Sequence, residues 1–474
     1  MRKLQKSVLA VILMTVFVLG LPAAVYADEN DAEKLKKESY ETPADTDSLT
    51  GWPAGPRVYA KAAIIMDMDS GAILYAKNAD EKLYPASITK LLTALVAVEN
   101  SDFTDKVLFT DDSISFLQYD DAHIGMQPGE IISMNDALHA LLLASANEVA
   151  YAIAENVGDK LGGGYTAFID KMNERSTELG CTGSHWTNAN GLHDENHYTT
   201  AHDMALIASE VSRHQELLDI MQTLNYTIGA TNLVDEPRTF QQHHKMLWEG
   251  NSNYYEYCIG GKTGYTDDAG TTLVTMADNG KMRLAAVVLY DYGTDAYVDT
   301  RAMFDYTYGN FSKISLIEEE KPKQIKEYTD PEAYVVLPPG IEYKDLEMEI
   351  TVQDEKEGTG KVTYLYQNQN VGSTEVTLTP EYIESATGYT TRLQLSGAAE
   401  DEQNVQENGR IPLWGKVLLI AGAAVVILVI IAVLILMQVR RRRKQRRMRR
   451  RRQQIKKMRR RERSQRNYKG KRRE

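Results

Sequence analysis

Apolar residues follow Pro85 at a spacing close to the helical period. They recur at Ile88, Leu91, Leu92, Leu95, Val96 and Val98. This pattern predicts a largely buried helix with Ser87 at its start. Lys90 lies three residues, almost one helical turn, after Ser87, so we expect both side chains on the same face of that helix.

Further helices are predicted from the same periodicity. Residues Met134–Val157 have helical spacing, with Asn135 as the expected cap, and Ser145 and Asn147 lie at a break in this region. Thr200 begins a pattern that resembles a capping box. The other predicted helices cover Phe168–Leu179, the segment from Thr200 through Val211, and Thr300–Tyr308.

Short apolar runs predict strands before and after these helices. Two runs, Ala62–Met66 and Ala72–Tyr75, surround a turn and predict a β-hairpin. Two later runs, Thr271–Met276 and Arg283–Tyr290, are joined through Asn279-Gly280, a strong hairpin signal. These strands can share one antiparallel sheet with helices packed around it, which predicts an α+β domain.

Beyond about residue 314 the pattern changes to strict alternation of apolar and polar positions. This alternation predicts a small all-β domain. The alternating apolar positions include Leu346, Met348, Ile350, Val352, Val362, Tyr364, Tyr366, Val376 and Leu378.

Two long apolar runs lie near the ends of the chain. Residues 1–27 combine basic residues, an apolar run and small residues up to Ala27, which is typical of a cleaved signal peptide. The uncharged stretch Val417–Met437 is long enough to cross a bilayer and predicts one transmembrane helix. Arg440 begins a basic run after it, so the positive-inside rule places the tail in the cytoplasm and the body outside the cell membrane.

Charge is divided between the body and the tail. The formal net charge of the 474 residues is -12, but residues 440–474 contain 22 of the 54 Lys and Arg residues and only 2 of the 66 acidic residues. We therefore expect the tail to contact anionic membrane lipid. Because that role accounts for the basic run, the sequence does not require a nucleic-acid partner.

The pair Ser87 and Lys90 has the chemistry of a nucleophile and its base. The first turn of a helix favours an alkoxide and disfavours a protonated lysine nearby. A lysine on the same face can accept the proton of the serine hydroxyl. Ser-x-x-Lys alone is a weak signal, because serine is a common helix cap.

Two further motifs strengthen this interpretation. Ser145-Ala146-Asn147 follows an apolar run, and Lys262-Thr263-Gly264 follows Ile259-Gly260-Gly261. The order Ser-x-x-Lys, Ser-x-Asn, Lys-Thr-Gly marks penicillin-recognising serine enzymes. Together, the three motifs in this order are specific for that class of enzyme.

Other reactive residue types give no second constellation. His193 and His197 lie among turn residues without a His-Glu-x-x-His pattern, and His243-His244 is equally isolated, so we predict no metal and no cofactor. Cys181 and Cys258 are the only cysteines. An exported protein could pair them or leave two free thiols, and the sequence does not decide between these states.

The region from about Val58 to Phe311 resembles the exported D-alanyl-D-alanine carboxypeptidases, which are low-molecular-mass penicillin-binding proteins. The trailing β domain also resembles the second domain of that family. The resemblance extends to Tyr84–Lys90, Asn190-Gly191-Leu192, His197–Ala201 and Gly261–Thr266. It implies a penicillin-binding transpeptidase or β-lactamase-like α+β fold, peptidoglycan stem peptides as substrates and β-lactam antibiotics as inhibitors.

The resemblance also implies roles for individual residues. Ser87 would be acylated, Lys90 would be its base and Ser145 would relay a proton to the leaving amine. Asn147, Lys262, Thr263, Gly264 and Tyr265 would bind substrate, with the backbone amides of Ser87 and Tyr265 forming an oxyanion hole. Arg283 could support the carboxylate site or be an exposed strand residue.

Alternatives remain at the level of the reaction. The family often has Ser-Gly-Asn where this chain has Ser145-Ala146-Asn147, and many relatives end in an amphipathic helix rather than a full span. No Glu-x-x-Leu-Asn lies between Asn147 and Lys262, which disfavours a class A β-lactamase. A D,D-endopeptidase, a transpeptidase or a non-catalytic penicillin-binding cell-wall protein would carry the same motifs.

These expectations divide the chain into seven segments. They are a signal peptide (1–27), an acidic flexible lead-in (28–57), the D,D-carboxypeptidase domain (58–312), a small β domain (313–382), a polar stalk (383–410), a transmembrane helix (411–439) and a basic cytoplasmic tail (440–474).

Overall fold

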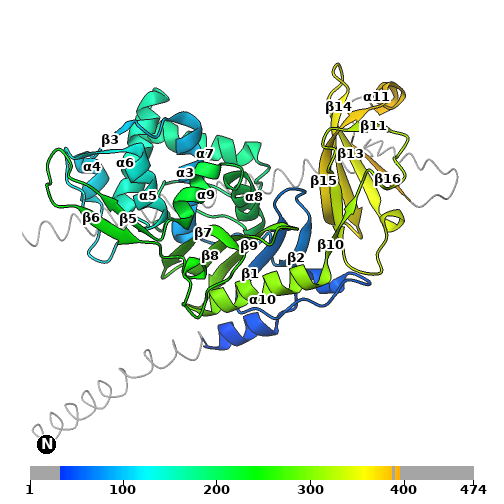
Figure 1. Ribbon diagram of the computed structural model, residues 1–474, viewed down its shortest axis with the longest axis horizontal. Helices are drawn as coiled ribbons and strands as arrows, with labels where there is room; N and C mark the ends of the chain where they lie inside the picture. Colours follow the sequence, from blue (N-terminus) through cyan, green and yellow to red (C-terminus); the bar gives the residue numbers. More distant parts are fainter. Residues whose placement is uncertain (1–32, 387–389, 396–474) are drawn as a thin grey trace, which may run out of the picture. The chain divides into compact units, whose positions relative to one another are not determined.

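A five-stranded antiparallel sheet forms the centre of the larger domain (Figure 1). The structure is a computed structural model and describes residues 33–386 and 390–395. The strand order is β2-β1-β9-β8-β7. The bounds are β1 Ala62–Asp67, β2 Ile73–Lys77, β7 Cys258–Thr266, β8 Gly270–Asp278 and β9 Arg283–Asp291. The early hairpin and the late strands therefore share one sheet, which confirms that prediction.

Both faces of this sheet are covered, so its strands are apolar at nearly every position. In β1, Ala62, Ile64 and Met66 belong to the core on one face, whereas Ala63 and Ile65 belong to the core on the other. One face packs against a helical layer, and the other packs against the C-terminal helix of the domain (Figure 1). Burial on two faces explains why the strands read as continuous apolar runs.

The helical layer begins with the turn that carries Ser87. A 3-10 turn, η2 (Ala86–Thr89), leads directly into the buried helix α3 (Lys90–Asn100). The remaining helices of the larger domain are α4 Asp111–Ser115, α5 Met134–Leu142, α6 Asn147–Lys160, α7 Gly164–Glu178, α8 Ala201–Val211, α9 Gln215–Gln222 and α10 Asp295–Asn310. Two small hairpins join them, β3 Lys106–Leu108 with β4 Ile131–Ser133, and β5 Asn225–Ile228 with β6 Arg238–Gln241.

The predicted break in Met134–Val157 separates two helices. Helix α5 ends at Leu142 and α6 begins at Asn147, so Ser145 lies in the connection. The expected cap at Asn135 is wrong. Ser133 caps α5 instead, because its hydroxyl accepts from the Asp136 N–H while the Asp136 carboxylate accepts from the Ser133 N–H.

The expectation of a flexible lead-in is wrong for residues 33–57. Residues 33–41 are helical and a 3-10 turn, η1, covers Asp45–Ser48. Buried Lys77 of β2 donates to the carbonyl oxygens of Ser39, Val58 and Ala60. The acidic, polar composition suggested disorder, but the segment is held by these polar contacts and by Ala44 and Trp52, which are buried in the core of the domain.

The second domain is a small β structure, as the alternation predicts. Its five-stranded sheet has the order β11-β15-β14-β13-β16, and β10 pairs with β12. Its contacts with the larger domain include the β1–β2 turn, where the Tyr334 hydroxyl donates to Asp67 and the Ser373 N–H donates to the Ser70 carbonyl. The Tyr366 hydroxyl also donates to the Thr50 carbonyl. The elements are β10 Ser312–Ser315, β11 Ile325–Tyr328, β12 Tyr334–Leu337, η4 Tyr343–Asp345, β13 Glu347–Asp354, β14 Thr359–Tyr366, β15 Gln369–Leu378, α11 Pro380–Ala386 and β16 Thr391–Gln394.

Several predicted segments lie outside the described residues. These are the signal peptide, the transmembrane helix, the basic tail and most of the polar stalk. The predicted end of the β domain at residue 382 is wrong, because β16 pairs with β13 in the sheet of that domain. Within 33–386 and 390–395, the structure contains no helix with the length and apolar character needed to cross a membrane.

Candidate active site

Ser87 lies on the tight turn η2, half-buried between the central sheet and the helical layer. Ala86 has a φ of 50°, a strained value for a residue other than glycine. Three contacts hold this turn. The Thr89 hydroxyl donates to the Ala86 carbonyl, and the Thr272 hydroxyl of β8 donates to the Pro85 carbonyl. The Gly191 backbone also lies so close to Ala86 that a Cβ on Gly191 would be 1.9 Å from the Ala86 carbonyl oxygen.

Lys90 is fully buried at the start of α3 and lies among three oxygen atoms. Its Nζ is 2.9 Å from Ser87 Oγ, 2.7 Å from Asn147 Oδ1 and 2.5 Å from the Asn190 carbonyl oxygen. A neutral amine has two N–H donors and one lone pair. Because the Asn147 and Asn190 oxygens can only accept, they take both donors and leave the lone pair for the hydroxyl proton of Ser87.

The surroundings of Lys90 favour the neutral amine. Burial, followed by the positive charge of Lys262, lowers the pKa of Lys90 well below its ordinary value. Glu148 and Asp121 oppose this shift, but their effects are smaller. A buried neutral lysine beside a serine hydroxyl can accept a proton near neutral pH.

The connection between α5 and α6 brings the second motif to the same place. Ser145 has a φ of 60°, and its Oγ lies 3.0 Å from the Nζ of Lys262. Lys262 also donates to the Thr263 carbonyl, 2.7 Å away. Burial lowers the pKa of Lys262 to about 7. Ser145 is thus linked to one lysine and Asn147 to the other, which joins the three motifs into one hydrogen-bonded cluster.

The third motif lies within β7, an edge strand of the central sheet. Gly264 faces the nucleophile turn. A Cβ on Gly264 would lie 2.4 Å from Thr272 Oγ1 and 2.9 Å from the backbone nitrogen of Ser87. Only glycine lets β7 approach Ser87 this closely, so that Thr263 and the backbone of Tyr265 lie near the hydroxyl.

These groups open onto a cavity of about 320 Å³. Ser87, Ser145, Thr263, Gly264 and Tyr265 line it, together with His243. Lys90, Asn147 and Lys262 are not part of the lining. Lys90 contacts the Ser87 hydroxyl, Lys262 contacts the Ser145 hydroxyl, and Asn147 contacts Lys90. The structure therefore brings together all eight residues predicted from the sequence.

Two contributions to the site were missed by the sequence analysis. The Asn190 carbonyl contacts Lys90, yet a backbone oxygen from a loop one hundred residues away leaves no local signal beyond the Asn190-Gly191-Leu192 pattern. His243 lines the cavity, is exposed and makes no hydrogen bond to any described residue. A lone histidine in sequence gives no indication of such a position.

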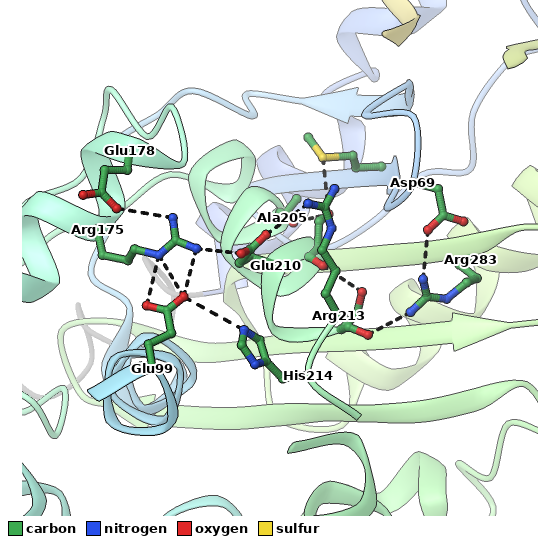
Figure 2. Close-up of polar contacts among 12 residues, drawn as sticks. Asp69, Glu99, Arg175, Glu178, Ala205, Glu210, Arg213, His214 and Arg283 are labelled. Atoms are coloured by element: carbon green, nitrogen blue, oxygen red, sulfur yellow. Dashed lines mark hydrogen bonds and ion pairs between the residues drawn. The ribbon is translucent and has the colours of Figure 1, made fainter. Parts of the chain in front are cut away.

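Arg283 does not lie in the candidate site. Its guanidinium pairs with Asp69 at 2.9 Å and donates to the Ser212 carbonyl at 3.0 Å (Figure 2). It ties the start of β9 to the β1–β2 turn and to the end of α8. This placement excludes the carboxylate-binding role considered for it.

One group of side chains has the composition of a metal site. Glu99, Glu210 and His214 can bring ligand atoms within 4.8 Å of one another. However, the Arg175 guanidinium already contacts both carboxylates, at 2.9 and 2.6 Å (Figure 2). We therefore describe this group as an ion-pair network and assign no metal to it.

The histidines singled out in sequence have structural surroundings. Buried His197 contacts the Thr89 hydroxyl through Nε2 and the Thr187 N–H through Nδ1, and burial lowers its pKa to about 3. His244 is also buried and lies 3.0 Å from the Thr275 hydroxyl. Cys181 and Cys258 are free thiols in the structure.

Fold and site together have the arrangement of a serine acyl-transfer enzyme, with a buried lysine amine beside a serine hydroxyl. Comparison with known proteins gives the family. Residues 50–293 match the sequence profile of D-alanyl-D-alanine carboxypeptidases, which is more than half of the chain. The chain belongs to this family of serine-type D-alanyl-D-alanine carboxypeptidases.

Curated relatives are similar over the same region. The chain is 28% identical to the D-alanyl-D-alanine carboxypeptidase DacF of Bacillus subtilis over 319 residues, which cover 62% of this chain and 77% of the relative. It is 33% identical to DacC of Escherichia coli over 253 residues, which cover 49% of this chain and 57% of that protein. The match thus spans between about half and three quarters of these relatives.

A solved structure supports the fold. Penicillin binding protein 5 from Haemophilus influenzae aligns with a TM-score of 0.54 and 24% identity, over 69% of this chain and 98% of that one. This likeness confirms the α+β arrangement of the larger domain and agrees with a following β domain.

Proposed function

We propose that Ser87 is the nucleophile of this carboxypeptidase and that neutral Lys90 is its general base. The observation that carries this proposal is the set of contacts around Lys90 Nζ, in which two obligate acceptors leave one lone pair for Ser87. Attack on the penultimate D-alanine carbonyl then forms an oxyanion. The backbone N–H groups of Ser87 and Tyr265 are its expected donors.

The other motif residues serve the departing D-alanine. Ser145 donates its proton to the leaving amine and is reprotonated through its hydrogen bond to Lys262. Protonated Lys262 and the Thr263 hydroxyl attract the terminal carboxylate of the substrate. Asn147 holds the peptide side of the substrate while its Oδ1 contacts Lys90.

Water then hydrolyses the acyl-enzyme, so that stem pentapeptides of peptidoglycan are trimmed to tetrapeptides. β-Lactams inhibit the enzyme by acylating the same hydroxyl. The family membership supports hydrolysis over transfer. A peptide ending in D-Ala-D-Ala, incubated with the enzyme and an added amine, tests this choice: mass spectrometry should show tetrapeptide and free D-alanine, and predominant amine adducts would overturn it.

The nucleophile is tested with a labelled penicillin. Ser87→Ala should abolish covalent labelling, and Lys90→Met should slow acylation roughly 10²- to 10⁴-fold. Ser115→Ala, an exposed serine on α4, is the matched control and should label like the unaltered protein. Labelling of Ser87→Ala at the normal rate would contradict the assignment.

We further propose that the body of the protein is exported and anchored by residues 411–439, with the tail 440–474 in the cytoplasm near anionic lipid. The apolar run and the basic residues after it support this topology. Protease added to intact cells stripped of their wall should remove the body and leave a small fragment that contains the tail. A protected full-length body would contradict the proposal.

A further inference from the structure

Glu148 directly follows the Ser145-Ala146-Asn147 motif, and its side chain is fully buried in the first turn of α6. One carboxyl oxygen, Oε1, accepts from the Ile124 N–H at 2.8 Å. The other oxygen, Oε2, is buried and has no hydrogen-bond partner among the described residues. Burial of a carboxyl group is unfavourable, and it raises the pKa of Glu148. A purely space-filling role therefore does not explain an acidic side chain at this position.

The partner of Glu148 belongs to the wall of the candidate active site. Residues 121–126 lie between α4 and β4, and Ala122 of this segment lines the cavity that contains Ser87. The Ala122 carbonyl accepts from the Asn147 N–H at 2.8 Å. Two successive residues of α6, Asn147 and Glu148, thus hold two backbone groups of the same wall segment.

The contact with Glu148 is the stronger anchor of this segment. Arg238 of β6 also holds it, through a hydrogen bond of 3.2 Å to the Gly125 carbonyl, but that contact is exposed. A carboxylate that accepts from a backbone N–H in a buried position makes a shorter and stronger bond. We therefore expect the position of the wall to depend on Glu148 more than on Arg238.

Asn147 connects the wall to the proposed base. Its N–H is held by Ala122, and its Oδ1 lies 2.7 Å from the Nζ of Lys90. In the proposed reaction this oxygen occupies one of the two N–H donors of the neutral amine. If Asn147 moved, that donor would lose its acceptor and the amine could rotate its lone pair away from Ser87.

We propose that Glu148 is a positioning residue of the reaction. Its carboxylate fixes residues 121–126 to α6, and this keeps Asn147 Oδ1 on the amine of Lys90. The inference rests on the proposed function, in which Lys90 is the base. Glu148 does not contact the substrate and acts through Asn147.

The charge of Glu148 gives this role a measurable signature. Negative charge on Glu148 and on Asp121 favours the protonated amine of Lys90, whereas burial and the charge of Lys262 favour the neutral amine. His123 acts on Glu148 itself, since its positive charge favours the carboxylate. Removing the charge of Glu148 should therefore lower the pKa of Lys90, an effect that a loss of packing alone does not predict.

The test compares two variants of the full-length chain on a peptide that ends in D-Ala-D-Ala. In Glu148→Leu the Ile124 N–H loses its acceptor, so kcat should fall at least tenfold while KM changes less than about threefold, because the placement of Lys90 affects the chemical step. Glu148→Gln retains an acceptor oxygen and should keep kcat at the optimum pH within about threefold. In Glu148→Gln the rise of kcat/KM that follows the loss of the Lys90 proton should move about 0.5 pH unit or more to lower pH.

Glu155 on the same helix provides the matched control. Its carboxylate accepts from the Thr110 hydroxyl at 2.7 Å, and Thr110 caps α4 at the other end of the connection that contains the wall. Glu155→Leu breaks this contact without affecting the partners of Asn147. It should change kcat less than about twofold. Circular dichroism establishes that each variant folds.

The possible failures are distinguishable. Equal kcat values for Glu148→Leu and Glu155→Leu overturn the inference, and so does a loss of kcat in Glu148→Gln as large as that in Glu148→Leu. If Glu148→Leu does not fold, the pH profile of Glu148→Gln decides, and a rise at the unaltered pH overturns the inference. Failure of the unaltered protein to release D-alanine would instead reject the proposed function.

Discussion

Two buried lysines contact the hydroxyls of Ser87 and Ser145, and the proposed reaction requires opposite charge states for these lysines. Lys90 must be neutral to accept the proton of Ser87, whereas Lys262 must be charged to attract a carboxylate. Burial lowers the pKa of both side chains, and the charge of Lys262 lowers that of Lys90 further. The positive charge of Lys262 therefore favours the neutral, reactive state of Lys90.

The rate should consequently depend on the charge states of both lysines. Loss of the Lys90 proton raises kcat/KM for a D-Ala-D-Ala peptide, and loss of the Lys262 proton near its pKa of about 7 produces a descending limb in the pH profile. In Lys262→Arg the guanidinium stays charged, so the descending limb should move to higher pH. If the descending limb of the Lys262→Arg variant lies at the same pH as that of the unaltered protein, Lys262 is not the group whose titration causes it.

Gly264 allows a second prediction at the residue scale. In Gly264→Ala the new methyl group would collide with Thr272 and with the backbone of Ser87, which displaces the expected oxyanion donor. We expect acylation by penicillin to slow roughly 10²-fold or more. Gly309→Ala on α10 has no atom within 4 Å of its new methyl group and should acylate normally. Similar rates for both variants would contradict a close approach of β7 to Ser87.

The sequence predicted residue types at this scale better than it predicted their partners. Ser87, Lys90 and the two later motifs could be identified because their order and spacing are specific. The Asn190 carbonyl could not, because a backbone oxygen is present at every position of a chain. Arg283 could not be placed either, since its partners Asp69 and Ser212 depend on the packing of two distant segments.

At the scale of elements, the helical layer is joined by the ion-pair network around Arg175. This side chain on α7 contacts Glu99 of α3 and Glu210 of α8, and all three are about one-fifth exposed or less (Figure 2). Partial burial makes the network more sensitive to the loss of its cation than an exposed pair would be, because two nearby carboxylates would remain.

Arg175→Met should therefore lower the free energy of unfolding by about 1–3 kcal/mol. Arg213→Met is the control, because Arg213 is 64% exposed and makes one pair with Glu210 at 3.4 Å. Its effect should stay within about 0.5 kcal/mol. Urea unfolding followed by circular dichroism measures both changes, and equal losses would mean that the helices do not depend on this network.

Element types followed from periodicity, whereas element ends did not. The break between α5 and α6 could be predicted because Ser145 and Asn147 interrupt an apolar face. The cap could not be chosen between Ser133 and Asn135, since both residue types cap helices well. The three-residue strands β3 and β4 were also too short to show alternation.

At the scale of the whole molecule, the segment before the first strand is part of the folded domain. Tyr40 stacks on Tyr59 at 4.5 Å, Lys36 pairs with Asp295, and the Ser39 carbonyl accepts from buried Lys77 at 2.6 Å. Composition could not reveal this packing, because the partners Asp295 and Lys77 lie in other parts of the sequence. Asp295 begins α10, whose next two residues line the catalytic cavity.

A chain that starts at Thr42 should accordingly be less stable than one that starts at Asp28. Truncation removes the Ser39 acceptor from a lysine whose pKa burial already lowers to about 8, and it removes the partner of Asp295. With two or three lost contacts of about 1 kcal/mol each, Tm should fall by roughly 5 °C or more. Lys36→Ala should reproduce part of the loss, whereas Lys37→Ala, which breaks only an exposed pair with Glu41, should not. Equal Tm values for the two chains in a thermal unfolding experiment would show that residues 33–41 add nothing to the stability of the domain.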